Sequence, residues 1–227
     1  MTSKDKSARQ TTEFRQAALI DAVLRLAARR NPSGITTGDL AQAVGITQAA
    51  VFRHFDSKEA IWLATMAWVT RTLMAQLHAA AGLAGDGLAA PHQPANDARP
   101  DALAALRAVF MAHVDFVICH PGVPRIIFQE LQQPQDTAVK ASVRQLMQQY
   151  RLLVMRLLTL AQSEHLIAPS ADLQSASVLF LGSVQGLVMQ SLTSGDAAAM
   201  ALAAPGVFAI FERGLRADGQ IFSQGTP

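Results

Sequence analysis

Residues 35–55 read ITTGDLAQAVGITQAAVFRHF, and this stretch decides the fold. Two short helical segments, one ending at Val44 and one beginning at Gln48, are separated by Gly45, a residue suited to the left-handed turn after a helix. The small side chain of Ala41 allows two helix backbones to cross closely. The residues expected to point inward and join the segments are Leu40, Val44, Ile46 and Val51. The stretch therefore predicts a helix-turn-helix.

The second segment, expected to be helical over residues 48–55, has a face that takes no part in this core. Gln48, Ala49, Phe52 and Arg53 share that face. Gln48 can form two hydrogen bonds with an adenine edge, Ala49 can touch a thymine methyl group, and Arg53 can pair with guanine or phosphate. Further candidate contacts to DNA, at helix N-termini and basic positions, are Thr36, Thr37, Thr47, His54 and Lys58.

A longer stretch, TTGDLAQAVGITQAAVFRHFDSKEAIWLA from Thr36, resembles the N-terminal domain of the TetR family of repressors. The similarity covers about residues 15–64; its motifs are Thr36-Thr37, Leu40-Ala41, Gly45, Phe52–Phe55 and Ser57–Glu59. The resemblance implies a homodimer on double-stranded operator DNA and an all-α C-terminal core that dimerises and binds a small effector. The C-terminal region resembles the family only in helical content and length. At Phe52 the family usually has tyrosine.

The composition of the 227-residue chain favours helices throughout. Half of the residues are apolar and 16% are charged, a balance typical of a well-buried globular chain. Alanine and leucine dominate, whereas β-branched and aromatic residues are sparse. We expect an all-α fold: a three-helix helix-turn-helix domain at residues 1–56, and a helical effector-binding and dimerisation domain at 57–227. The expected helices span about 12–30, 37–44, 48–55, 58–81, 101–119, 123–131, 136–163, 171–192 and 205–217, with a linker at 82–100.

Charge and cysteine usage indicate the compartment and the kind of partner. Residues 1–70 carry nine Lys and Arg against six Asp and Glu, and residues 71–227 carry ten against eleven. The excess of positive charge near the N-terminus suits an anionic partner. The single cysteine, Cys119, excludes an internal disulfide, the N-terminus lacks a signal peptide, and no apolar run approaches the roughly 20 residues of a membrane span. We expect a cytoplasmic protein that has no membrane partner.

The C-terminal region offers candidates for effector binding and for dimerisation. Small residues at four-residue spacing between 171 and 192 let two helices approach closely, and the last helix would supply the partner surface. The expected dimer contacts are Leu179, Gly182, Gly186, Phe208 and Phe211. Candidate effector contacts, for each of which simple core packing is an alternative, are Phe110, His113, Val117, Phe128, Tyr150 and Gln185. The apolar composition suggests an apolar effector of unknown identity.

Catalytic and metal-binding patterns are weak. His113 and Asp115 face different sides of a helix, His113, His120 and His165 lack a compact metal spacing, and Cys119 is best interpreted as an inert thiol. We therefore expect a repressor released from its operator by a small effector, with no enzymatic activity, cofactor or metal. One alternative is a DNA-bound structural protein regulated by a protein partner. The other is an enzyme or lipophile carrier with a vestigial helix-turn-helix.

Overall fold

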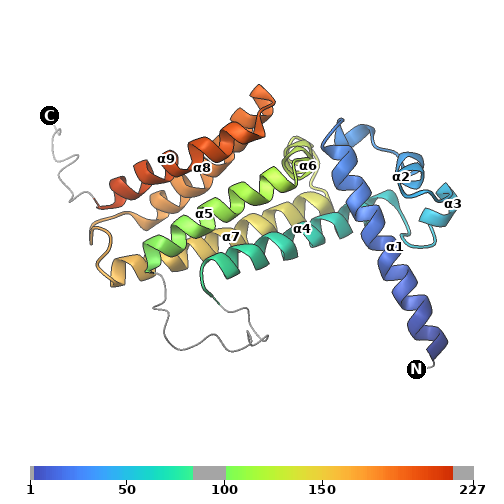
Figure 1. The fold of residues 1–227 in the computed structure, drawn as a ribbon, viewed down its shortest axis with the longest axis horizontal. Helices are drawn as coiled ribbons and strands as arrows, with labels where there is room; N and C mark the ends of the chain where they lie inside the picture. The colour runs from blue at the N-terminus through green and yellow to red at the C-terminus, as the bar shows by residue number, and fades with distance from the viewer. Residues whose placement is uncertain (1–2, 84–100, 217–227) are drawn as a thin grey trace. The chain divides into compact units, whose positions relative to one another are not determined.

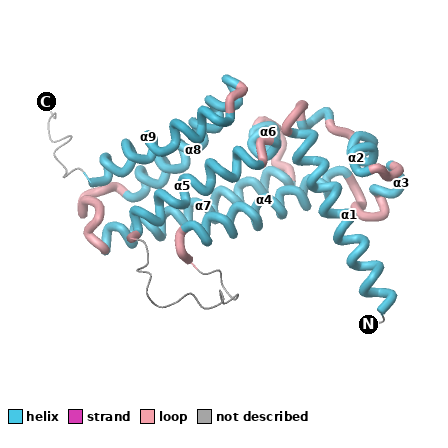
Figure 2. The backbone as a smooth tube through the Cα atoms, viewed as in Figure 1, coloured by secondary structure: helices cyan, strands magenta, loops and turns pink. Residues whose placement is uncertain are grey.

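The computed structural model describes residues 3–83 and 101–216, and every regular element in those ranges is a helix (Figures 1 and 2). The all-α prediction is confirmed. Most of the expected linker at 82–100 lies outside the described residues. The helices are α1 (Ser3–Ala27), the 3-10 helix η1 (Pro32–Gly34), α2 (Thr37–Val44), α3 (Gln48–Val51), α4 (Lys58–Ala80), α5 (Ala102–Cys119), α6 (Gly122–Leu131), α7 (Ala138–Ser163), α8 (Leu173–Ser194) and α9 (Ala197–Arg216).

Two compact units divide the chain. The first contains residues 1–72 and 119–146, and the second contains residues 73–118 and 147–227. Helices α4 and α7 contribute residues to both units. The segment 119–146, which was expected in the C-terminal domain, joins the first unit because α6 packs against α1. The expected domain boundary after residue 56 stays a prediction.

Three helices have bounds that differ from the predictions for a physical reason. Helix α1 begins at Ser3, because no proline or glycine interrupts residues 3–27. Helix α9 begins at Ala197, within an alanine-rich run that Asp196 caps by accepting hydrogen bonds from the Ala198 and Ala199 amides. Helix α3 is only four residues long and ends at Val51. The chain after α3 turns more tightly: the His54 amide donates to the Val51 carbonyl at 2.9 Å, an i to i−3 bond.

A reciprocal cap fixes the start of α2. The Thr36 hydroxyl accepts from the Asp39 amide at 3.1 Å, and the Asp39 carboxylate accepts from the Thr36 amide and hydroxyl at 2.7 Å. The same carboxylate pairs at 3.0 Å with Arg30, which follows α1. These hydrogen bonds from Thr36, followed by those of the Arg30 guanidinium, lower the pKa of Asp39 to about 2. A charged network therefore joins the end of α1 to α2.

Helix α6 approaches α1 more closely than any side chain at its first position would allow. A Cβ atom placed on Gly122 would lie 2.2 Å from the Leu24 carbonyl oxygen and 3.0 Å from the Ala28 amide nitrogen. Gly122 itself is buried. Because both obstacles are backbone atoms, no rotamer change can relieve the clash. Glycine at this position lets the two helix backbones pack directly against each other.

Aromatic rings fill the core of the second unit. Phe180 lies 5.3 Å from Phe110, 5.5 Å from Phe211 and 6.3 Å from Tyr150, measured between ring centroids. Phe208 lies 5.6 Å from Phe110 and is fully buried. The edge-on and tilted arrangements are those that aromatic pairs favour. This cluster packs α5, α7, α8 and α9 against one another.

Three helices are long and apolar enough to span a membrane, judged by length and composition only, so the expectation that no segment is long and apolar enough was wrong. Among the described residues, α5, α8 and α9 satisfy both criteria. In the most apolar 18-residue stretch of α5, 50% is buried inside the chain. In the corresponding stretches of α8 and α9, only 33% and 28% is buried. Much of the apolar surface of α8 and α9 is therefore left uncovered by this chain.

We predict that Gly122→Ala lowers the free energy of unfolding by about 1–3 kcal/mol, the usual effect of forcing an extra group into a packed contact. The matched control is Gly206→Ala within α9, where a Cβ would meet no atom within 4 Å. That substitution should raise stability by roughly 0.5–1 kcal/mol, because alanine is the better helix former. Chemical denaturation of both variants measures the difference; equal stabilities would contradict the close approach.

We also predict that Asp39→Asn flattens the acid dependence of stability. The pKa of Asp39 is about 2 in the folded chain against 3.8 ordinarily, so its contribution is present above pH 3.8 and is lost as the pH falls through about 2. The variant should melt below wild type at pH 7, and the gap should close between pH 4 and 2. Asp56→Asn is the control, since Asp56 accepts no hydrogen bond from any described residue. A gap that persists at pH 2 would argue against the charged cap.

Candidate nucleic-acid interface

The turn between α2 and α3 has the geometry that the sequence predicts. Gly45 has φ of 72°, a left-handed conformation, and its amide donates to the carbonyls of Ala41 and Gln42. The Ile46 amide donates to the Ala41 carbonyl at 3.0 Å, which completes the helix end. Leu40 and Ala41 are buried between the helices, together with Val51. Val44 and Ile46 are half-buried.

The face of α3 and its following turn is exposed at the four positions expected to meet DNA. Gln48, Ala49 and Arg53 are exposed, and Phe52 has 46% of its surface exposed. Phe52 follows directly after α3 as its C-cap residue. These four residues, named here the recognition face, lie on an element fixed from behind by the buried Val51.

One side chain of the recognition face is held in place before any DNA binds. The Gln48 amide nitrogen, Nε2, donates a hydrogen bond to the Thr37 hydroxyl at 2.8 Å. Thr37 itself is buried, with 9% of its surface exposed. An amide group carries two N–H donors and a carbonyl acceptor. Gln48 therefore keeps one donor and its acceptor for another partner while Thr37 fixes its direction.

The remaining candidate contacts surround this face. Thr36 and Thr47 are exposed N-cap residues, and Thr47 accepts from the Ala50 amide at 3.2 Å. Lys58, half-buried, opens α4, whose N-terminus is capped by Ser57 through the Ala60 amide at 3.0 Å. His54 is half-buried, and its Nδ1 atom is buried without a hydrogen-bond partner. Only the other ring nitrogen of His54, Nε2, is left as a candidate for reaching a phosphate.

Sequence reasoning missed a residue that supports this site from outside the motif. The Gln16 side chain on α1 donates to the His54 carbonyl at 2.9 Å, across 38 residues of sequence. That bond holds the tight turn after α3, which carries Phe52 and Arg53. No local sequence pattern predicts this hydrogen bond, because glutamine is common on helix surfaces and the acceptor is a backbone atom.

The candidate effector contacts do not all lie together. Two of them are in contact: the His113 Nδ1 atom and the Tyr150 hydroxyl are 3.1 Å apart. Burial lowers the pKa of His113 to about 4 and raises that of Tyr150. Phe110 and Val117 are buried in the same unit, and Gln185 is exposed, with its amide 4.0 Å from the Met147 sulfur. Phe128 is half-buried and belongs to the first unit.

The candidate dimer contacts divide into two groups. Leu179 and Gly182 are exposed and Gly186 is half-buried, and a Cβ at either glycine would meet no atom within 4 Å. Phe208 and Phe211 are instead buried against Phe180 inside the same chain. Their rings fill the core of the second unit, and Phe211 also contributes to the lining of a groove between α8 and α9. Their role as dimer contacts stays a prediction.

The region that contains the recognition face is similar to known proteins. Residues 19–65 match the sequence profile described as bacterial regulatory proteins, tetR family. An uncharacterized HTH-type transcriptional regulator of Mycobacterium tuberculosis is 34% identical over 73 residues, which is 32% of this chain and 36% of that protein. The nucleoid occlusion factor SlmA of Vibrio vulnificus is 30% identical over 95 residues, 42% of this chain and 41% of that protein. The matches thus span well under half the length of these curated relatives.

Solved structures resemble the chain over most of its length. The fatty acid degradation regulator FadR from Bacillus halodurans has a TM-score of 0.73 at 15% identity, covering 89% of this chain and 96% of that one. AibR in complex with isovaleryl coenzyme A and operator DNA has a TM-score of 0.60 at 19% identity, covering 77% and 86%. Identities this low establish a shared fold alone. Over residues 19–65, the chain is similar to bacterial regulatory proteins of the tetR family.

Proposed function

We propose that this regulator is a repressor that binds operator DNA as a homodimer and leaves it when a small, largely apolar effector binds to the second unit. The observation that carries the proposal is the recognition face, in which an exposed Gln48 is already oriented by Thr37. In a dimer, two such faces would enter successive major grooves of a pseudo-palindromic site, about one helical turn apart or somewhat more.

The groups on the recognition face suit direct base readout. The free N–H of Gln48 can donate to adenine N7 while its carbonyl oxygen accepts from adenine N6. Arg53 can donate to guanine or to a phosphate, and Ala49 can contact a thymine methyl group. Phosphate contacts would come from Lys58, from His54, and from the N-termini of α2 and α3 at Thr36, Thr37 and Thr47. Together these contacts supply both specificity and salt-dependent affinity.

Dimerisation is proposed through the exposed face of α8 and α9. A groove of about 620 Å³ runs between these helices, with Leu179, Ser183 and Ile210 in its lining. Ile210 is 65% exposed and Leu202 on α9 is 84% exposed. Apolar side chains this exposed mark an interaction surface, and Gly182 and Gly186 would let a partner helix approach closely. The same face accounts for the incomplete burial of two long apolar helices without a membrane, and it supports a cytoplasmic location.

The effector proposal rests on the pair formed by the half-buried His113 and the buried Tyr150. With a pKa of about 4, His113 is uncharged at neutral pH, as is a tyrosine whose pKa is raised. The pair can therefore offer hydrogen bonds but no compensating charge to a ligand in the aromatic core. This chemistry favours an effector with an apolar body and an uncharged polar atom. Release from DNA requires that the effector bind the non-DNA state more tightly.

A second candidate function is a DNA-bound protein regulated by a protein partner, without a small effector. The match to a protein named as a nucleoid occlusion factor motivates a candidate other than an effector-controlled repressor. The two candidates differ in whether a small molecule alone changes DNA binding.

Selection of bound fragments from genomic DNA tests the proposal. We expect enrichment of a few pseudo-palindromic sites, with binding that weakens steeply as salt rises. Methyl isovalerate, an uncharged ester with an apolar body, is a first effector probe, with the isovalerate anion as its charged control. Release by the ester alone would support a repressor with an apolar effector site. Enrichment of no sequence would contradict the proposed operator recognition.

We predict that Gln48→Ala and Arg53→Ala each weaken specific operator binding by roughly 1–3 kcal/mol if each contacts a base edge. Both side chains are exposed, so circular dichroism and melting temperature should match wild type. Titration of labelled operator measures the loss. Arg71→Ala, an exposed arginine on α4, is the control. If both variants bound the operator with wild-type affinity, the recognition face would not be the surface that contacts DNA.

Phe52→Tyr should tighten operator binding several-fold. By resemblance, the family's tyrosine offers a hydroxyl to the DNA backbone, and phenylalanine lacks it. A net hydrogen bond contributes roughly 0.5–1.5 kcal/mol, and a dimer would form two. Since Phe52 is 46% exposed, folding should tolerate the added oxygen. Affinities at several salt concentrations should shift in parallel, because a neutral hydroxyl displaces no counterion. Weaker binding with a lowered melting temperature would defeat the idea that Phe52 faces DNA.

Gly186→Leu should yield monomers or aggregates. A Cβ atom at this half-buried position would meet no atom of other parts of the chain within 4 Å, so the individual chain should still fold, but a partner helix could no longer approach as closely. Sedimentation velocity measures the effect. Gln148→Leu, which adds the same side chain to an exposed position of α7, should leave the assembly unchanged. An intact, normally stable Gly186→Leu dimer would move the interface elsewhere.

A further inference from the structure

We propose that a cavity in the first unit is a binding site for small aromatic carboxylates, separate from the effector site proposed above. The cavity has a volume of about 410 Å³, within the range of small-molecule sites. All of its lining residues belong to the first unit, which also contains the recognition face. The side chains proposed for effector recognition, His113 and Tyr150, belong to the second unit.

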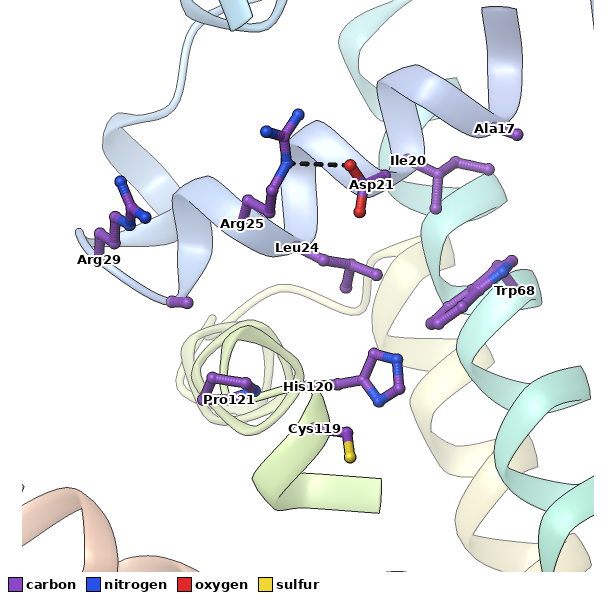
Figure 3. Close-up of a pocket in the computed structure, with 11 residues that line it drawn as sticks. Ala17, Ile20, Asp21, Leu24, Arg25, Arg29, Trp68, Cys119, His120 and Pro121 are labelled. Atoms are coloured by element: carbon purple, nitrogen blue, oxygen red, sulfur yellow. Dashed lines mark ion pairs between the residues drawn. The ribbon is translucent and has the colours of Figure 1, made fainter. Parts of the chain in front are cut away.

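Two adjacent stripes of α1 and of the turn that follows it form one wall of this cavity (Figure 3). Residues four apart lie above one another on a helix, and the lining accordingly divides into an exposed stripe and an apolar stripe. The exposed stripe is Ala17, Asp21, Arg25 and Arg29, and the apolar stripe is Ile20, Leu24 and Ala28. Ala28 and Arg29 lie in the turn after α1, which ends at Ala27. The facing wall comes from Trp68 on α4 and from Cys119, His120 and Pro121, where α5 ends and α6 begins.

The charges of the cavity favour an anion. Asp21 and Arg25 neutralise each other in an ion pair of 2.9 Å. Arg29, also in the lining, is exposed and forms no ion pair with any described residue. One guanidinium is thus available beyond the internal pair, and its planar fork of N–H donors matches a carboxylate.

The apolar part of the cavity favours a flat ring. Ile20 and Leu24 are buried, and Leu24 points from α1 toward Trp68 and His120 (Figure 3). The rings of Trp68 and His120 pack edge to face, with centroids 5.3 Å apart and an angle of 61°. Trp68 is half-buried, so part of its indole is left for a second aromatic contact. A ligand with its carboxylate at Arg29 and its ring against Trp68 and Leu24 satisfies both halves of the site.

The cavity contains its own reporter. Cys119 is the chain's single cysteine, and it is exposed in the cavity wall. A ligand in the cavity should shield this thiol, whereas a ligand in the core of the second unit should not. The rate at which the neutral reagent 4,4′-dithiodipyridine modifies the full chain therefore reports occupancy of this cavity alone.

The experiment measures that rate against increasing 2-naphthoate, with 2-naphthamide as an uncharged probe of the same shape. We expect saturable protection by 2-naphthoate and at least fivefold weaker protection by the amide. Protection that is equal for the two probes, or absent at millimolar naphthoate, would overturn the proposal.

Two charge substitutions of opposite sign make the test sharper. Arg29→Gln should raise the half-protecting concentration of 2-naphthoate by about fivefold, the upper range for an exposed ion pair, and Asp21→Asn should lower it. Arg125→Gln, an exposed arginine of α6 outside the cavity, is the matched control. The response to 2-naphthamide should not change in any variant. An Arg125→Gln effect as large as that of Arg29→Gln would show that only the overall charge matters and would overturn the assignment of the carboxylate to this cavity.

Discussion

The backbone contact between α6 and α1 determines which residues form the first unit, which carries the recognition face. Gly122 lets the first turn of α6 lie directly against the α1 backbone at Leu24 and Ala28. Through that contact, a segment more than 90 residues later in the chain becomes part of the same compact unit as α2 and α3. Helix α1 is thus packed between two neighbours, since it contacts both α2 and α6. The orientation of the recognition face consequently depends on residues far outside the helix-turn-helix.

Features that depend on nearest neighbours in sequence were predictable. The left-handed Gly45, the caps at Thr36 and Thr47, and the exposure of Gln48 and Arg53 are all consequences of a few adjacent residues. Each obeys a local rule of helix termini or helix periodicity. The fold class was equally predictable, because composition and hydrophobic periodicity favour helices along the whole chain.

Features that depend on distant residues were not predictable. The bond from Gln16 to the His54 carbonyl and the pairing of Arg30 with Asp39 require the tertiary arrangement of α1. Sequence periodicity marks Phe208 and Phe211 as one apolar face, but it cannot tell whether that face meets a partner chain or Phe180 of the same chain. After Val51, the i to i−3 bonds of the Arg53 and His54 amides occur beside the i to i−4 bond of the Phe55 amide, and periodicity does not predict this change of hydrogen-bond pattern.

The hydrogen bond from Gln48 to Thr37 has a consequence for the thermodynamics of recognition. A free glutamine side chain loses roughly 1.5–2 kcal/mol of rotamer entropy when it is immobilised. In this protein much of that loss occurs on folding, when Thr37 fixes the amide, and under the proposed function it would not occur again on the operator. A side chain held in this way also cannot swing to follow a mismatched base. Preorganisation should therefore raise the penalty for wrong sequences as well as the affinity for the right one.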